Sequence, residues 1–345
     1  MSEFVLVSGY YGFSNPGDDA ILESIISTLK AQNIVPVVLY NTRSHFYKDN
    51  VHYIPRYNFL KIYYWMINSS FIILGGGGLF QDSTSFFSFL YYFVIGMISI
   101  LSGKKLIIYG QSFGPIKRKV SLLLLKIVLY FSEYIFIRDV YSFRLTYLLG
   151  EGKKAFLIPD IVYFLDISLT YHLNKKQEIL IFPRDRGDIE KLVKILRYIL
   201  NKFNINLTII PMHYPIDKDV ARSIFEKIND RGVRVIDKPL ERKDILREIG
   251  DSLGVISYRF HGLVFSHIVG VPFIGISDDP KIFSYLDSLN VKCLSPWGGE
   301  FDFIEKWVYH IYTSRKKDMK IKSSLKREKE KKINLENIFY MLKGE

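Results

Sequence analysis

Residues 71–109 read FIILGGGGLFQDSTSFFSFLYYFVIGMISILSGKKLIIY, and this stretch decides the fold. Two apolar runs, Phe71–Leu74 and Leu106–Tyr109, flank 21 uncharged residues from Ser83 to Gly103. That length is enough to cross a bilayer whose hydrocarbon core is about 30 Å thick. The segment also holds five serines, one threonine and two glycines, and two buried parallel strands need a crossover helix at this place. We therefore expect a crossover helix. A transmembrane helix and a helix whose aromatic side touches a bilayer surface are the alternatives.

Apolar runs of strand length alternate with helix-length segments along the chain, which is typical of α/β folds with parallel sheets. The length of 345 residues favours two domains. Asp166–Glu178 is polar and without a clear period, so we interpret it as the linker. We expect Rossmann-like, doubly wound domains over 1–165 and 179–312, facing each other across a cleft, and a basic helical tail over 313–345. The predicted strands are Phe4–Val7, Val35–Leu39, Phe71–Leu74, Leu106–Tyr109, Tyr134–Ile137, Phe156–Ile158, Ile179–Phe182, Leu207–Ile210, Val233–Ile236, Gly254–Ser257 and Pro272–Ile276.

The positive charge of the chain is concentrated near its end. Of the formal net charge of +12, Arg315–Lys332 contributes ten basic and three acidic residues, a net of +7. A solvated charged helix explains this segment, and an anionic membrane surface is a further candidate partner. We expect no nucleic-acid role, because the segment has no interleaved aromatic residues. Cys293 is the single cysteine, and the first residues lack the pattern of a signal peptide, so we expect a cytoplasmic protein, in solution or peripheral on the inner face of the membrane.

The first predicted strand is followed by a turn-rich segment, Gly9–Ile21. Asp18 and Asp19 stand where acidic residues favour a helix N-terminus, which is the simplest interpretation of this pair. Metal binding is the alternative, but neighbouring side chains do not share a helix face. Tyr11 and Phe13 lie in a loop at the functional edge of a sheet, where aromatic rings are candidates for stacking on a sugar.

Later strands also end in residues suited to binding. Four glycines, Gly75–Gly78, allow a ligand or another part of the chain to approach closely, but their spacing gives neither a P-loop nor a dinucleotide motif. Arg138 follows a strand, where a guanidinium binds a carboxylate or phosphate or pairs with Asp139 or another neighbour. His213 and Asp217 follow another strand and serve either the turn or a site.

The sharpest cluster is in the second half. Arg259 and His261 follow the strand Gly254–Ser257, and Lys281 follows the next strand. Neighbouring parallel strands bring these side chains to one edge, near a helix N-terminus that favours anions. The cluster predicts an anion site with a histidine that exchanges protons near neutral pH. We assign His267 to packing.

Taken together, these blocks resemble the polysaccharide pyruvyl transferase family over residues 4 to 283. The sequence departs from the family pattern at Ser14-Asn15-Pro16, at Ser112-Phe113, at Phe260 and at Gly262. None of these departures removes a charged residue. The matching blocks are Gly9–Ile21, Gly75–Asp82 with Thr84-Ser85, Gly110–Pro115, Arg138-Asp139 with Ser142, Pro211–His213, Arg259–Gly262 and Gly270–Lys281.

The resemblance implies a GT-B-like pair of domains and an enzyme that transfers pyruvate from phosphoenolpyruvate to a glycan. It implies donor-site roles for Arg259, His261 and Lys281, with Arg138 reaching the donor from the other domain. It places the acceptor, a glycan that is free or lipid-linked, on the side of the first domain. The acceptor-side residues would be Tyr11, Phe13, Gly76, Gly77, Gln81 and Asp82.

We expect a reaction that needs no cofactor and no metal, with phosphoenolpyruvate as the donor substrate. We hypothesise that His261 protonates the donor's methylene carbon, that a sugar hydroxyl attacks, and that phosphate leaves as a second hydroxyl closes the ketal. Two rival functions stay open. One is a nucleotide-sugar glycosyltransferase, since the fold class supports many activities. The other is a non-catalytic glycan- or anion-binding protein at the membrane.

Overall fold

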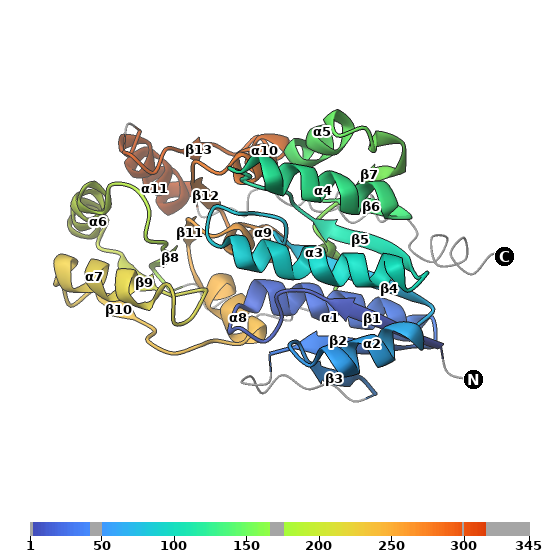
Figure 1. Ribbon diagram of the computed structural model, residues 1–345. Helices are drawn as coiled ribbons and strands as arrows, with labels where there is room; N and C mark the ends of the chain where they lie inside the picture. Colours follow the sequence, from blue (N-terminus) through green and yellow to red (C-terminus); the bar gives the residue numbers. More distant parts are fainter. Residues whose placement is uncertain (1–2, 42–49, 166–175, 299, 315–345) are drawn as a thin grey trace. The chain divides into compact units, whose positions relative to one another are not determined.

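The computed structural model describes residues 3–41, 50–165, 176–298 and 300–314. The chain divides into two compact units. Of the described residues, the first unit holds 3–13 and Asp18–Leu165, and the second holds Ser14–Gly17, 176–298 and 300–314. These units are the first and the second domain, and Figure 1 labels their helices and strands.

The first domain is built on a parallel sheet. Its described strands lie in the order β3-β2-β1-β4-β5-β6-β7, and all neighbours are parallel. The direction of winding reverses between β1 and β4, as in Rossmann folds. The strands are β1 (Glu3–Ser8), β2 (Ile34–Tyr40), β3 (His52–Pro55), β4 (Phe71–Gly77), β5 (Lys105–Gln111), β6 (Tyr134–Ile137) and β7 (Ala155–Leu157).

Helices cover both faces of this sheet, so its strands are apolar throughout. Leu6 packs in one core with α2, α3 and α4, whereas its neighbours Val5 and Val7, which are also buried, point to the opposite face because successive side chains alternate. The helices are α1 (Pro16–Ala31), α2 (Phe59–Ile67), α3 (Phe86–Leu101), α4 (Lys119–Phe131) and α5 (Val140–Leu148), followed by the short 3₁₀ helices η1 (Gly152–Lys154) and η2 (Ile161–Phe164).

The segment Ser83–Gly103 forms the predicted crossover helix. Helix α3 connects β4 to β5 and begins after Ser85, whose Oγ accepts a hydrogen bond from the Ser88 amide at 3.2 Å. Phe89 and Tyr92 on one side of the helix are buried in the core of the domain. Across the described residues, none of the helices has the length and hydropathy of a membrane span.

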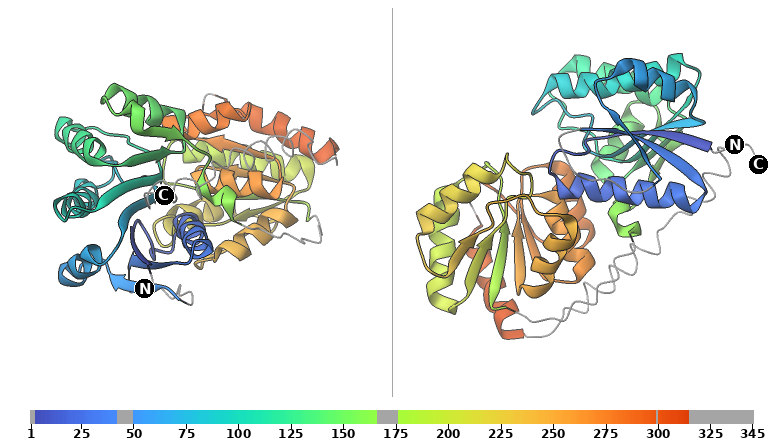
Figure 2. Two further views of the ribbon diagram at one scale, coloured as in Figure 1. Left: turned by 90° about the vertical axis from the view of Figure 1, so that its right-hand side faces the viewer. Right: turned by 90° about the horizontal axis from the view of Figure 1, so that it is seen from below.

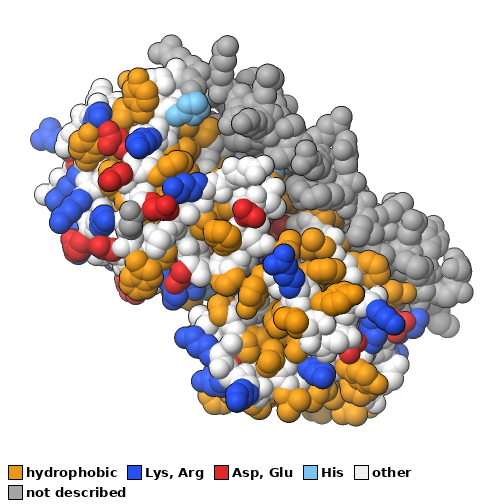
Figure 3. Space-filling model, turned by 90° about the horizontal axis from the view of Figure 1, so that it is seen from above, with side chains coloured by type: hydrophobic (Ala, Val, Ile, Leu, Met, Phe, Trp, Pro, Cys, Tyr) orange, Lys and Arg blue, Asp and Glu red, His pale blue; other side chains and the backbone are white. Residues whose placement is uncertain are grey.

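Large apolar side chains are exposed on α4 and α5. They include Leu123, Phe131 and Leu148, and Figure 3 shows hydrophobic side chains gathered on this face of the first domain. Lys117 and Arg118, just before α4, are exposed as well. Contact of α4 with an anionic bilayer surface stays a prediction.

The second domain repeats the arrangement with a smaller parallel sheet, in the order β10-β9-β8-β11-β12-β13 for the described strands. Figure 2 shows this sheet edge-on between layers of helices. The winding reverses between β8 and β11. The strands are β8 (Glu178–Phe182), β9 (Asn206–Ile209), β10 (Val233–Val235), β11 (Gly254–Ser257), β12 (Phe273–Ile276) and β13 (Cys293–Leu294). The helices are α6 (Ile189–Phe203), α7 (Lys218–Ile228), α8 (Arg242–Asp251), α9 (Phe260–Val269), α10 (Pro280–Ser288) and α11 (Asp302–Ser314).

Helix α6 shows how local sequence builds this domain. The Asp188 carboxylate accepts a hydrogen bond from the Lys191 amide at 2.9 Å and caps the first turn. Asn204 ends the helix in the left-handed conformation that asparagine tolerates. Leu192 and Leu196 are buried against the sheet, and burying one such side chain stabilises the fold by roughly 1.5–3 kcal/mol.

The predicted strands coincide with observed strands to within about three residues at each end. The predictions omit β3 and β13, which are short edge strands without an apolar run of their own. The predicted linker is wrong at its last residue, because Glu178 begins β8. Residues 166–175 of that linker and the tail beyond residue 314 lie outside the described residues.

Gly76 gives a test of how tightly α1 packs on β4. Its φ of +63° lies in the left-handed region, and an added Cβ would collide with Ile21 Cγ2. Gly76→Ala should lower the free energy of unfolding by about 3 kcal/mol through strain and overpacking. Gly103→Ala is the matched control, because Gly103 has a φ of +68° but no atom within 4 Å of an added Cβ. It should cost about 1 kcal/mol, and equal losses in urea unfolding would contradict the packing described.

Candidate functional site

Charged side chains gather at one edge of the second sheet. Strands β9, β8, β11 and β12 are neighbours in that order, so the loops after their carboxyl ends lie side by side. The loops after β9, β8 and β11 carry Asp217, Arg184 and Arg259, and the first turn of α10, after β12, carries Lys281. Doubly wound sheets bind ligands at this edge, at the point where the winding reverses.

Asp217 fixes the guanidinium of Arg259. Arg259 Nε donates to Asp217 Oδ2 at 2.8 Å, and Nη2 donates to Oδ1. The Asp217 carboxylate is 1% exposed and also accepts a hydrogen bond from the His213 amide at 2.9 Å. Asp217 therefore joins the loops after β9 and β11. A bidentate pair fixes the plane of the guanidinium, so Arg259 is oriented before a ligand arrives.

His261 lies in the first turn of α9. The residue is 8% exposed, and its ring centroid is 5.4 Å from that of Phe260 and 6.1 Å from that of Phe265. The first turn of a helix leaves amide N–H groups without partners inside the helix, which favours anions there. His267, by contrast, is buried beside Tyr285 and Phe273, which confirms the prediction that it packs.

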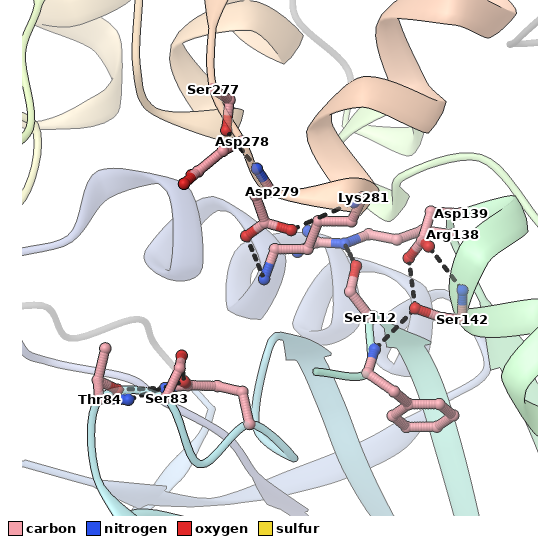
Figure 4. A network of polar contacts seen from close by, with 12 residues as sticks. Ser83, Thr84, Ser112, Arg138, Asp139, Ser142, Ser277, Asp278, Asp279 and Lys281 are labelled. Carbon is pink, nitrogen blue, oxygen red and sulfur yellow. Dashed lines mark hydrogen bonds and ion pairs between the residues drawn. The ribbon is translucent and has the colours of Figure 1, made fainter. Parts of the chain in front are cut away.

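Lys281 occupies the matching position in α10, the helix after β12. Its Nζ lies 3.4 Å from Asp279 Oδ2, and its amide donates to Asp279 Oδ1 at 3.2 Å (Figure 4). Asp278 next to it accepts hydrogen bonds from both Nε and Nη2 of Arg186. The loop after β12 thus holds two carboxylates, each with a cation beside it.

Arg184 is a site residue that the sequence analysis missed. It stands two residues after β8, as Arg259 stands two residues after β11, and the last residues of these strands are paired in register. Among the described residues, Arg184 donates no hydrogen bond and has no carboxylate at ion-pair distance. Burial and the charge of Arg259 lower its pKa, whereas Asp279 and Asp217 act in the opposite direction. An arginine two residues after an apolar strand was the signal that would have found it.

The charge of this cluster also acts on His213. Burial, and then the positive charge of Arg259, lower the pKa of His213 to about 4, against the effect of Asp217. His213 is therefore neutral at pH 7. The neutral His213 and the half-buried Arg184 both indicate that this edge of the sheet has too little negative charge to balance its cations. Such an edge suits a small anion.

In the first domain, Arg138 is held by an ion pair. Its Nη1 donates to Asp160 Oδ2 at 2.6 Å. Its Nε donates to Ser112 Oγ at 2.8 Å (Figure 4). Asp139 accepts hydrogen bonds from the amide and the hydroxyl of Ser142 and caps α5. The structure thus shows the neighbour pairing that the sequence left open, with Asp160 as the partner. Contact of Arg138 with a donor stays a prediction.

The predicted stacking role of Tyr11 is wrong for this conformation. The residue is 1% exposed, and its hydroxyl donates to the Gly75 carbonyl at 2.6 Å, so no ring face is open to a sugar. Gly76 and Gly77 are part of β4 and are buried. The side chain of Ile21 packs against Gly76 and that of Asp18 against Gly77. These glycines therefore admit α1, which is the second of the two interpretations that the sequence allows.

The remaining acceptor-side predictions concern Phe13, Gln81 and Asp82, and these residues have different surroundings. Phe13 is half-buried and stacks on Tyr10, with ring centroids 4.1 Å apart. Gln81 lies in an exposed network with Ser83 and Thr84 (Figure 4).

Asp82 is buried and accepts hydrogen bonds from the amides of Lys117 and Arg118 at 2.7 and 3.0 Å. Burial acts to raise its pKa, but these hydrogen bonds, one from Ser121 and the charge of Arg118 outweigh it, and the pKa is lowered. The prediction that Asp82 binds an acceptor is therefore wrong, since the carboxylate holds the start of α4.

Asp18 and Asp19 lie in the first turn of α1, as predicted. Burial raises the pKa of Asp19 to about 6, although a hydrogen bond from the Gly12 amide acts to lower it. Over the ranges that the structure describes, no group of three or more His, Cys, Asp or Glu side chains is placed to hold a metal ion.

Comparison with known proteins agrees with the fold and names a family. Residues 15–280 match the family model for polysaccharide pyruvyl transferase, whereas no curated protein matches the chain by sequence. Among solved structures, HepE from Anabaena in complex with UDP and glucose is 12% identical with a TM-score of 0.68, and the match covers 99% of this chain and 100% of that one.

Two further structures are similar. The UDP-GlcNAc 2-epimerase from Methanocaldococcus jannaschii is 11% identical with a TM-score of 0.63, covering 92% of this chain and 94% of the epimerase. MurG from Acinetobacter baumannii is 10% identical with a TM-score of 0.53, covering 95% of both chains. At such low identity the likeness shows the fold alone, and it confirms the predicted GT-B-like pair of Rossmann-type domains.

The neutral His213 predicts a pH-dependent loss of stability. Its pKa is about 4 in the folded protein, against 6.5 for an ordinary histidine. Between these values the unfolded chain binds more protons, so the free energy of unfolding falls as the pH falls. In urea unfolding from pH 7 down to pH 4.5, wild type should lose more free energy than His213→Gln. Parallel losses in the two proteins would show that His213 titrates normally.

Proposed function

Because the chain belongs to the polysaccharide pyruvyl transferase family, we propose that it moves the pyruvyl group of phosphoenolpyruvate onto two hydroxyls of a glycan sugar. The product is a cyclic ketal, and phosphate is released. Family membership makes the chain a transferase, and the donor and the ketal are the proposed part. The observation that supports this donor best is Arg184, a half-buried guanidinium with no carboxylate partner among the described residues.

The charges of the second domain suit this donor. Phosphoenolpyruvate carries a carboxylate and a phosphate a few ångströms apart, so it needs more than one fixed cation. Arg184 and Arg259 stand at equivalent positions after paired strands, and Lys281 follows the next strand of the sheet. We assign the phosphate and the carboxylate to these three side chains, which would stabilise the negative charge as it shifts to the leaving phosphate.

His261 would supply the proton transfers. As an imidazolium it gives a proton to the methylene carbon, which becomes a methyl group, and an oxocarbenium-like centre forms at the adjacent carbon. The first sugar hydroxyl attacks that centre and returns its proton to the imidazole. The bond to the phosphate oxygen then breaks, the second hydroxyl forms the second carbon–oxygen bond, and its proton leaves with the phosphate. One donor and one diol thus give one ketal and one phosphate.

Phosphate release with alternative donors tests the proposed function. The purified protein is incubated with a glycan acceptor and either phosphoenolpyruvate or UDP-glucose, because HepE, a similar structure, was determined with UDP and glucose. Phosphate released from phosphoenolpyruvate only when acceptor is present supports the proposal. Release of UDP instead, or no reaction with either donor, contradicts it.

The role of His261 predicts a loss of turnover rather than of binding. General acid catalysis typically contributes about 10² to 10⁴ in rate, so His261→Ala should lower kcat by roughly that factor. Its affinity for phosphoenolpyruvate, measured by calorimetry, should stay within about tenfold of wild type. A variant that turns over at nearly the wild-type rate would remove His261 from the chemistry.

Arg184 and Arg186 offer a matched pair for the donor site. Both follow β8, but Arg186 is exposed and paired with Asp278. Arg184→Gln should weaken binding of phosphoenolpyruvate by about tenfold to a hundredfold, the worth of a hydrogen bond to a charged group. Arg186→Gln should change the affinity less than about threefold, since a surface ion pair contributes little. If calorimetry gave the two variants the same affinity, Arg184 would not be a donor ligand.

A further inference from the structure

The first domain contains a buried arginine that the donor site does not use. Arg56 follows β3, and its amide donates to the Tyr40 carbonyl at the end of β2, at 3.2 Å. The residue is 6% exposed. It therefore lies at the carboxyl edge of the first sheet, where doubly wound folds bind ligands.

Aromatic rings surround this guanidinium. Its Cζ lies 4.3 Å from the ring centroid of Tyr91, 4.9 Å from that of Phe13 and 5.3 Å from that of Tyr57. Its Nη2 donates to the Tyr92 hydroxyl at 3.5 Å. Ring faces attract a cation, but each is worth only about 0.5–2 kcal/mol.

The charge of Arg56 has no counter-ion in the part of the chain that the structure describes. Among the described residues, no carboxylate lies within ion-pair distance of it, and its buried Nε has no hydrogen-bond partner. Burying an uncompensated charge and an unpaired donor is costly. Reversible binding of an anion would account for both features, because the anion would supply a negative charge for the guanidinium and a hydrogen-bond acceptor for Nε.

A cavity of about 510 Å³ opens beside this side chain. Its lining includes Arg56, Tyr40, Asn41, Pro55, Tyr57 and Phe59, and none of its described lining residues is acidic. The volume lies in the range of about 300–1,000 Å³ that is usual for small-ligand sites. Aromatic rings in the lining can stack on the apolar face of a sugar, and the side-chain amide of Asn41 can hydrogen-bond to hydroxyls.

We propose that this cavity binds an acidic pyranose of the acceptor and that Arg56 pairs with its acid group. The proposal rests on the proposed function, since it names the class of glycan that receives the pyruvyl group. Two sources of the acid group share this chemistry: the carboxylate of a uronic acid and a phosphate on the anomeric carbon. Tyr57, which is 70% exposed at the rim, would cover the sugar ring.

Direct binding without donor tests this site. Ligand-observed NMR and calorimetry would measure the affinity for pyranoses of the gluco, galacto and manno configurations. In each configuration three compounds are compared: the neutral sugar and its uronic acid, each free or as the methyl glycoside, and the sugar 1-phosphate. We expect at least one acid to bind wild type tenfold or more tightly than the neutral sugar of the same configuration. The uronic acid and the 1-phosphate distinguish the two sources of the charge.

Variants of Arg56 and Tyr57 complete the test. Arg56→Gln should abolish the preference for the acid, Arg56→Lys should retain part of it, and Tyr57→Ala should weaken acidic and neutral sugars alike. Affinity for phosphoenolpyruvate should be unchanged in all three, which separates this site from the donor assignment. Equal binding of acid and neutral sugars by wild type, no binding of any acid at 10 mM, or a preference that survives in Arg56→Gln would overturn the proposal. If Arg56→Gln does not fold, Arg56→Lys and Tyr57→Ala decide.

Discussion

The second domain depends on one constraint: several positive charges must be held together at the carboxyl edge of a buried parallel sheet. Parallel strands bring Arg184, Arg259 and Lys281 to one edge because their strands are neighbours, although the residues are far apart in the chain. Asp217 compensates Arg259, and the Asp279 carboxylate stands beside Lys281, while no carboxylate of the described residues lies at ion-pair distance from Arg184. Burial, and then the positive charge of Arg259, keep the pKa of His213 low.

The two domains use one architecture for different chemistry. In the second, fixed cations and a histidine in the first turn of a helix suit a small, highly charged donor. In the first, the part of the corresponding edge around Arg56 is aromatic, and this buried guanidinium lies beside a cavity in the size range of small-ligand sites. The glycines of β4 serve packing against α1, so the acceptor site that we propose is built on aromatic rings and Arg56 rather than on a glycine loop.

The sequence predicts the fold well because the strands are buried on both faces and form uninterrupted apolar runs. The edge strands β3 and β13 lack such runs, so the sequence pattern does not predict them. Site residues are harder, because the sequence shows that a polar residue follows a strand but not what it pairs with. Asp160 lies 22 positions from Arg138 and Asp217 lies 42 from Arg259, so both ion pairs appear only in the folded chain. The predictions for Tyr11 and Asp82 are wrong for the same reason. Arg56 is not predicted as a site residue because β3, the strand before it, is too short to give an apolar run.

A crystal structure of the protein with phosphoenolpyruvate would test the central claim most directly. The donor should lie at the carboxyl edge of the second sheet, with its phosphate or carboxylate within about 3 Å of Arg184 and Lys281 nitrogen atoms, and with its methylene carbon in reach of the His261 imidazole. A donor bound away from Arg184, or with its methylene carbon turned from His261, would contradict both the assignment of the site and the proposed reaction.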